Sequence, residues 1–252
     1  MELLDDVSVQ LDPEEVLRRL HLGKEKYLED VQEVIEIAHS IIDPKVIYEV
    51  SYLDNENEDT VDIDGVRFTS RVLRANLDKI KRVFPYIMTI GKELENKATS
   101  FGDILKQYYL ETIGNVALDS IGKYLEDYLR KKYRLGKISE MNPGSLEDWP
   151  ITQQKQLFSI FGSVEDLIGV KLTDSFLMIP KKSVSGIYFP TEVMFYSCQL
   201  CPRKNCEERQ APYDKNLKDR YDDIQSTRKM GYLKPMEIEG SYETDTVFET
   251  IS

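Results

Sequence analysis

Three cysteines carry the most distinctive chemistry in this sequence. Cys198, Cys201 and Cys206 follow the pattern Cys-x2-Cys-x4-Cys and are the only cysteines in the chain. A turn between two cysteines separated by two residues brings both sulfurs to one side, where they can reach a single metal centre. The cationic neighbours Arg203 and Lys204 lower thiol pKa values and stabilise thiolates. We therefore predict that the three thiolates ligate one metal centre, with an iron–sulfur cluster as the first candidate.

Two other interpretations of the cysteines stay open. Zinc accepts the same spacing, but it is redox-inert, and a closed structural zinc site needs a fourth ligand that the motif lacks. Three reduced thiols without metal are the other alternative, because an odd number of cysteines does not form a closed disulfide framework. An iron–sulfur cluster can leave its fourth position to water, a small molecule or another protein, and it reaches the low potentials that electron delivery needs.

Other patterns exclude whole classes of function. The chain has 45 acidic and 33 basic side chains, a net charge of −12, which argues against nucleic acid as a partner. No apolar run approaches the roughly 20 residues of a membrane span, and the acidic start lacks a signal-peptide pattern, so we expect a cytoplasmic protein. Phosphate-binding glycine loops and nucleophile-elbow motifs are missing. His21 and His39 fall on different predicted helices, which favours surface roles over catalysis.

Hydrophobic periodicity predicts an α+β fold, a twisted and mainly antiparallel sheet with one long helix and several shorter helices packed on it. Asp12-Pro13 starts the first helix, and Asp64-Gly65 marks a hairpin. The other predicted elements are helices over 27–42, about 72–84 and 102–133, a strand at 86–91, a connecting loop over 136–150, strands on either side of Pro180-Lys181-Lys182, and a strand over 194–200.

The chain divides into four expected parts. Residues 1–85 form a helix and strand part of the same domain as the core, residues 86–197 form that core, and residues 198–213 carry the cysteine motif. Residues 214–252 form a polar tail that we expect to be flexible, because its last segment contains acids and no bases.

Three segments between residues 86 and 196 share a pattern with a known family. They are the helix end LEDYLRKKY, the loop with Pro143-Gly144 and Asp148-Trp149-Pro150, and the segment Leu172–Gly186. The last fits L-T-[DE]-S-x-x-M-x-P-x-x-S-V-S-G and is the most specific of the three. On these residues the chain resembles the activation (reactivation) domain of cobalamin-dependent methionine synthase, in a stand-alone form with a cysteine motif after the signature.

The resemblance implies a role in a repair cycle within methionine biosynthesis. Domains of this family bind S-adenosylmethionine (AdoMet) and dock over the cobalamin of a methyltransferase module, here expected in trans. Cobalamin that has slipped to the cob(II) state is reduced by one electron, which a donor protein could deliver, and is trapped by methylation from AdoMet. The chain would then be a component of a methyltransferase, and whether it is an enzyme by itself stays open.

The resemblance also carries ligand residues over, one at a time. An acidic side chain of the long helix falls at Asp119, and the small pair of the signature falls at Ser185 and Gly186. The Pro-Gly of the R-P-x-P-G-Y loop is kept, and the paired aromatic positions hold one phenyl and one phenol. The AdoMet residues that the resemblance implies are Asp119, Pro143, Gly144, Ser185, Gly186, Phe195 and Tyr196.

Two positions depart from the family loop. Glu140 stands where the family has arginine, and Ser145 stands where it has tyrosine. A glutamate reverses the charge that would pair with the ligand carboxylate. Either another base takes over, with Lys137, Lys181 and Lys182 as candidates, or AdoMet binding is lost. The alternatives are therefore a docking or metal-binding partner of a corrinoid protein without AdoMet, and a subunit of another corrinoid methyl-transfer system.

Overall fold

The computed structural model describes every residue except 24–26, 57–58, 207 and 229–252. After strand β1 (Glu2–Leu4) comes helix α1 (Pro13–Arg19), whose cap is Asp12: its carboxylate accepts a hydrogen bond from the backbone N–H of Glu14 at 3.0 Å. Helix α2 (Leu28–Ile41) buries its apolar residues at spacings of three and four. Both helices confirm the cap and periodicity signals of the sequence.

Among the described residues, the main sheet has eight strands, with β6 (Arg82–Thr89) at its centre. Every described pairing in it is antiparallel, and β6 pairs with β2, β3 and β10. Asp64 and Gly65, both with positive φ, form the predicted hairpin turn between β4 and β5. The α+β fold is confirmed. The remaining strands of this sheet are β2 (Lys45–Tyr48), β3 (Ser51–Glu56), β4 (Thr60–Ile63), β5 (Val66–Thr69), β7 (Lys137–Met141) and β10 (Ser183–Thr191).

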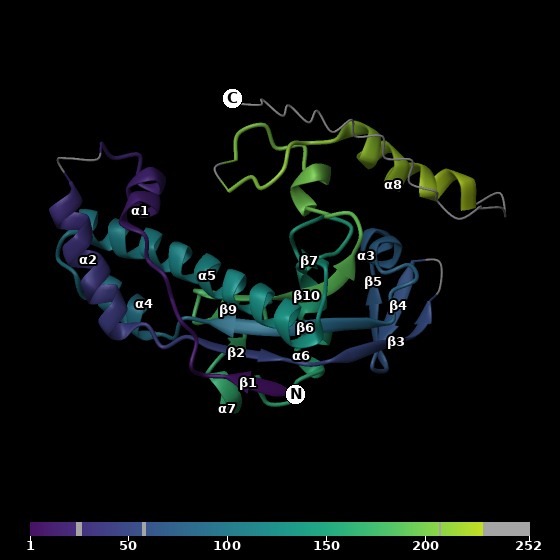
Figure 1. Cartoon of the computed structure of the whole chain (residues 1–252), viewed down its shortest axis with the longest axis horizontal. Coiled ribbons are helices and arrows are strands. Elements are labelled where there is room, and N and C mark those ends of the chain that lie inside the picture. Colours follow the sequence, from purple (N-terminus) through teal and green to yellow (C-terminus); the bar gives the residue numbers. More distant parts are fainter. Residues whose placement is uncertain (24–26, 57–58, 207, 229–252) are drawn as a thin grey trace, which may run out of the picture.

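The long helix α5 (Ile104–Tyr133) runs across one face of this sheet (Figure 1). Asp103 caps it by accepting a hydrogen bond from the N–H of Leu105 at 2.8 Å, and the helix ends at Arg134 in the left-handed conformation. Helices α2 and α4 (Glu93–Ser100) pack beside α5. The predicted helix over 102–133 is confirmed within two residues at its start.

The two faces of the sheet bury different apolar clusters. Tyr188 packs with α5 on one face, whereas Ile187 and Phe189 join a second cluster with Met141 and Trp149. Successive residues of a strand point to opposite faces, so β10 contributes to both clusters in alternation. A side chain of β10 can therefore reach the α5 side only from every second position.

Two predicted elements are wrong. Helix α3 (Arg71–Asn76) stops at Asn76, and residues 82–84, which we expected at the end of that helix, begin β6. The loop predicted over 136–150 contains β7, which pairs with β10. In both cases a partner strand distant in sequence decides the conformation, and local periodicity carries no information about that partner.

The signature segment forms a hairpin with a different turn from the predicted one. β8 (Lys171–Leu172) pairs with β9 (Met178–Ile179), so the turn lies at residues 173–177 and not at Pro180–Lys182. Thr173 closes this turn, because its hydroxyl donates to the carbonyl of Leu177 and accepts from the N–H of Leu177, both at 3.0 Å. Residues 180–182 instead connect β9 to β10.

The strand predicted over 194–200 is also wrong, because this segment ends in a short 3-10 helix, η2 (Ser197–Leu200). The polar tail begins with helix α8 (Lys215–Arg228), which contacts η2, and residues 229–252 lie outside the described residues. Within the described residues, none of the helices has both the length and the apolar character that a membrane crossing requires. The other short helices are η1 (Ile151–Gln153), α6 (Gln154–Ser159) and α7 (Val164–Ile168).

Candidate functional site

Gly186 lies in β10 at a place where protein atoms leave no room for a side chain. A Cβ there would lie 2.5 Å from Nδ2 of Asn142, 2.8 Å from the carbonyl oxygen of Met141 and 2.9 Å from the hydroxyl of Tyr86. Glycine is thus required for packing between β6, β7 and β10. The space beside Gly186 is filled by protein atoms, and its role as an AdoMet residue stays a prediction.

Glu140, at the arginine position of the family loop, forms an acidic corner with its neighbours. Its carboxylate accepts hydrogen bonds from the Tyr86 hydroxyl and, at 2.8 Å, from Nδ2 of Asn142. The Tyr86 ring stacks on Tyr188 with 4.9 Å between centroids. Burial raises the pKa of Tyr86 well above its usual value, and the Glu140 charge raises it further. A ligand carboxylate placed at this corner would meet a like charge.

Ser185, Phe195 and Tyr196, the other AdoMet residues that the resemblance implies in or after β10, lie in different surroundings. Ser185 pairs with Ile87, on the face opposite Gly186, and its hydroxyl is buried without a hydrogen-bond partner. Phe195 is buried in the second apolar cluster, with its ring 6.2 Å from that of Tyr221. Tyr196 is half-buried at the start of η2, where its N–H donates to Oε1 of Gln199 at 2.9 Å. Their roles as AdoMet residues stay predictions, and Ser185 and Gly186 point to opposite faces of the sheet.

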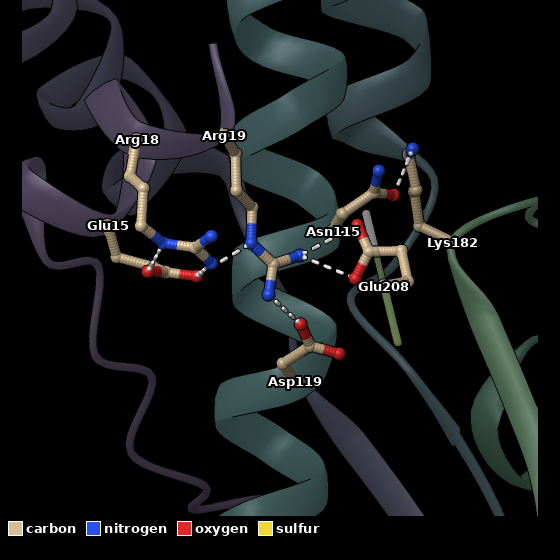
Figure 2. A network of polar contacts seen from close by, with 7 residues as sticks. All are labelled: Glu15, Arg18, Arg19, Asn115, Asp119, Lys182 and Glu208. Atoms are coloured by element: carbon tan, nitrogen blue, oxygen red, sulfur yellow. Dashed lines mark hydrogen bonds and ion pairs between the residues drawn. The ribbon is translucent and has the colours of Figure 1, made fainter. Parts of the chain in front are cut away.

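Asp119 belongs to an ion-pair network that we call the α5 network, made of Glu15, Arg18, Arg19, Asp119 and Glu208 (Figure 2). The Arg19 guanidinium lies 2.5 Å from Asp119, 2.8 Å from Glu15 and 3.4 Å from Glu208. Hydrogen bonds from Arg18 and then Arg19 hold the pKa of Glu15 at about 2. Asp119 therefore already has a cationic partner within the protein, and Arg19 would compete with a cationic ligand for its Oδ2 atom.

The lysines that were candidates to replace the missing arginine are placed differently from one another. Lys182 donates to Oδ1 of Asn115 at 2.7 Å and pairs with Glu111 at 3.0 Å (Figure 2 shows the Asn115 contact). The backbone N–H of Lys181 donates to the carboxylate of Glu95, while its side chain is exposed. Lys137 is exposed at the start of β7. Lys182 is thus already matched by a carboxylate.

The cysteine segment is organised by one guanidinium. Arg209 donates to the carbonyl of Cys198 at 3.0 Å, to that of Cys201 at 3.3 Å, and to that of Arg203. The three thiols are half-buried and not disulfide-bonded. Among the residues described, no three or more His, Cys, Asp or Glu side chains are arranged to hold a metal ion. The cysteines are therefore not a preassembled ligand set, and the iron–sulfur or zinc centre stays a prediction.

The loop after β7 is fixed by Asp148. Its carboxylate accepts hydrogen bonds from the Ser70 hydroxyl at 2.6 Å, the Arg71 Nε at 2.8 Å and the N–H of Val72 at 2.9 Å. Gly144, with a φ of +88°, turns the chain so that its N–H donates to the carbonyl of Trp149 at 2.7 Å. The loop is thereby tied to the start of α3, which lies far away in sequence.

A pocket of about 460 Å³ opens beside this loop, between α3, η2 and α8. We call it the loop pocket; its polar and charged lining includes Arg71, Ser145, Asp148, Cys201, Lys218 and Tyr221. None of the seven predicted AdoMet residues lines it, whereas Ser145 is the residue at the family's tyrosine position. No sequence pattern points to Arg71 or Lys218 as site residues, because α3 and α8 are far from the loop along the chain.

Comparison with known proteins agrees with the resemblance. Residues 121–211 match the model of the family described as vitamin B12 dependent methionine synthase, activation domain. Among solved structures, the MetH reactivation domain bound to AdoHcy matches with a TM-score of 0.54 and 16% sequence identity, covering 77% of this chain and 80% of that chain. No curated protein sequence matches the chain.

The structural match and the family match support different statements about this chain. The structural match, at its low identity, establishes the shared fold, while the family match includes the loop after β7, the signature hairpin and the cysteine segment. Together they confirm the resemblance predicted from Leu172–Gly186. Residues 121–211 of this chain therefore match the activation domain of the vitamin B12 dependent methionine synthase family.

Proposed function

We propose that this chain acts in the cytoplasm as a stand-alone reactivation domain, serving a cobalamin-binding methyltransferase module on another polypeptide, with methionine synthase as the first candidate. The observation that carries the proposal is the family match over residues 121–211. The solved relative is bound to AdoHcy, the molecule that AdoMet becomes when it gives up its methyl group. This supports AdoMet as the ligand of the present chain.

In this proposal AdoMet supplies a methyl group to the partner's corrinoid, after one electron from an external donor has reduced the cobalt, and AdoHcy is released. The chain itself binds and orients AdoMet and presents a surface to the partner. The acidic corner at Glu140 and the Arg19–Asp119 pair add structural departures from what the resemblance implies for that ligand to the Ser145 position and the phenyl of Phe195.

Calorimetry with AdoMet and a corrinoid assay test the proposal. The purified chain is titrated with AdoMet and is then mixed with a cobalamin-binding methionine synthase module in the cob(II) state and a chemical reductant. We expect AdoMet binding, and methylation of the corrinoid only when both the chain and AdoMet are present. Methylation at the same rate without the chain would contradict a reactivation role.

A second candidate function is favoured by the α5 network and the acidic corner. Both remove groups that would bind the amino-acid end of AdoMet, so the chain could instead be a docking partner that no longer binds it. Absence of AdoMet binding, together with retained binding to the cobalamin module, would establish this alternative. Recovery of a different corrinoid protein in a pull-down would point to another methyl-transfer system.

The cysteine motif is tested separately, and no step of the proposed reaction depends on it. We expect that anaerobically purified protein contains iron and sulfide in equal amounts and that a Cys201→Ser variant loses both. The spacing of the three cysteines is the observation behind this expectation. Zinc alone would favour a structural site. Protein that stays metal-free after reconstitution would favour the interpretation that the three cysteines are reduced thiols without a metal.

A further inference from the structure

Two of the three cysteines are brought together by one short turn. Cys198 lies in η2, and the N–H of Cys201 donates to the carbonyl of Cys198 at 3.2 Å, which closes the turn. Side chains three residues apart in a 3-10 helix lie on the same side, and three residues rise by roughly 6 Å. A disulfide joins cysteines whose Cα atoms are about 4.4–6.8 Å apart. The backbone therefore places Cys198 and Cys201 at a separation that a disulfide can bridge.

Contacts on both sides of this turn hold it in place. Leu200 is buried in the second apolar cluster and anchors η2 there. Arg209 donates to the carbonyl of Cys198 at 3.0 Å and to that of Cys201 at 3.3 Å, so one guanidinium spans the two cysteines. A backbone that is already ordered loses little further entropy when its two thiols join. The pair is therefore preorganised for a bond between its sulfurs.

Cys206 lies outside this turn. It is five positions beyond Cys201, and Pro202 directly follows the turn. The carbonyl of Cys206 accepts a hydrogen bond from the backbone N–H of Arg209 at 3.3 Å. The turn that orders Cys198 against Cys201 therefore does not order Cys206 against either of them. All three thiols are half-buried and not disulfide-bonded, so each keeps some access to a reagent in solution.

We propose that Cys198 and Cys201 form a reversible dithiol–disulfide pair, which makes this chain sensitive to the redox state of its surroundings, while Cys206 stays outside the pair. The oxidant is a disulfide, either of a small thiol or of a protein. One thiolate of the pair attacks that disulfide and releases a first thiol, which leaves a mixed disulfide on the chain. The second thiolate attacks the mixed disulfide and releases the second thiol. The pair thus loses two electrons and two protons, and the external disulfide gains them.

The pair and the metal centre proposed for the cysteine motif use the same sulfurs. A thiolate that ligates a metal is not free to attack a disulfide, and a sulfur in a disulfide is no longer a thiolate ligand. The disulfide is therefore the oxidised state of the metal-free chain, and metal loading protects the pair from oxidation. The inference concerns the metal-free chain alone, so it does not rest on the proposed function.

Thiol counting in a glutathione redox buffer tests the pair. Full-length protein is freed of metal with a chelator and equilibrated without oxygen at a series of ratios of reduced to oxidised glutathione. A maleimide then blocks the free thiols, and the intact mass gives the numbers of free thiols and of glutathione adducts. Peptide mass spectrometry identifies the bonded cysteines. The matched variants are Cys198→Ser, Cys201→Ser and Cys206→Ser, because each removes one thiol and only the last one keeps the pair.

We expect wild-type protein to lose two free thiols together, in one two-electron step, and to keep the third. Cys206→Ser should show the same step with an equilibrium constant within about threefold of wild type, and should end with no free thiol. Cys198→Ser and Cys201→Ser should lose this step and form glutathione adducts instead. A disulfide that includes Cys206, or wild-type cysteines that form only glutathione adducts or stay free across the series, would overturn the inference.

Arg209 is a positioning residue for this pair, and its substitution gives a second measurement. Arg209→Met releases both cysteine carbonyls, and we expect the equilibrium with glutathione to shift about tenfold towards the dithiol, because the thiols lose their fixed separation. Arg203→Met is the control. The Arg203 side chain is exposed, and its contact with Arg209 is made by the backbone carbonyl, which the substitution keeps. An unchanged equilibrium in Arg209→Met, or the same shift in both variants, would contradict the preorganised turn as the cause of pairing.

Discussion

The α5 network and the loop pocket are both rich in charge and both pair their charges, and they differ in what the pairs border. In the α5 network, Arg19 contacts carboxylates from three segments of the chain, so Asp119 has a cationic partner within the protein. In the loop pocket, Arg71 pairs with Asp148 and Lys218 pairs with Asp222, and these residues line a cavity of about 460 Å³. The same kinds of ion pair thus join separate segments in one region and border a cavity in the other.

The partner of Asp119 shows what a resemblance leaves out. Asp119 keeps the charge that the resemblance calls for, but its neighbour Arg19 comes from an N-terminal helix that no motif of the family signature covers. Identity of residue type at one position is therefore not sufficient support for a ligand contact.

The largest expected effect is at Asp148, which ties the pocket loop to α3. In Asp148→Ala, the Ser70 hydroxyl, the Arg71 Nε and the N–H of Val72 all lose their acceptor, and we expect a loss of about 3 kcal/mol in the free energy of unfolding. Glu147→Ala, at the exposed neighbouring position, is the control and should change stability by less than about 0.5 kcal/mol. Urea unfolding measures both. Equal effects would show that the pocket loop is not held by Asp148.

Alkaline pH should lower the free energy of unfolding through Tyr221, which lines the loop pocket. Burial raises the pKa of Tyr221 on α8 to about 12 from its usual 10. The folded state therefore disfavours the phenolate: stability is full below pH 10, falls as the pH rises from 10 to 12, and loses up to about 2.7 kcal/mol. Tyr221→Phe should flatten this part of the stability curve. An unchanged slope in the variant would mean that another group titrates there.

Gly186 tests how tightly the α5 side is packed. In Gly186→Ala, the new Cβ would lie 2.8 Å from a backbone carbonyl oxygen and 2.5 Å from the Asn142 amide, and we expect a loss of about 2 kcal/mol. Gly136→Ala is the control, because a Cβ at that position meets no atom within 4 Å. Thermal unfolding of the two variants gives the comparison. A neutral Gly186→Ala would imply more room between β7 and β10 than the structure shows.

The smallest expected effect is at Arg19. Arg19→Met removes three ion pairs with partners that are partly exposed, so we expect a loss of about 1 kcal/mol at low salt that shrinks as salt is added. Arg18→Met, which removes contacts to Glu15 alone from an exposed side chain, should lose less stability than Arg19→Met. If the two variants lose the same stability, the contacts of Arg19 to Asp119 and Glu208 contribute little.

Local signals in the sequence predicted the elements that depend on local interactions. Asp12 caps its helix, the spacing of three and four runs through α2 and α5, and Asp64-Gly65 turns a hairpin. The signature Leu172–Gly186 predicted the family. Each of these features is determined by contacts within a few residues along the chain, or by a contiguous pattern, so the sequence alone contains them.

Tertiary structure alone decided the rest. β7 was mistaken for a loop because its conformation depends on pairing with β10, and the start of β6 was mistaken for helix for the same reason. Arg19 reaches Asp119, and Arg71 and Lys218 meet at one pocket, only after segments far apart in sequence have packed together. Residue types show which charges a chain carries. Which of those charges neutralise one another, and which are left facing open space, is set by long-range packing.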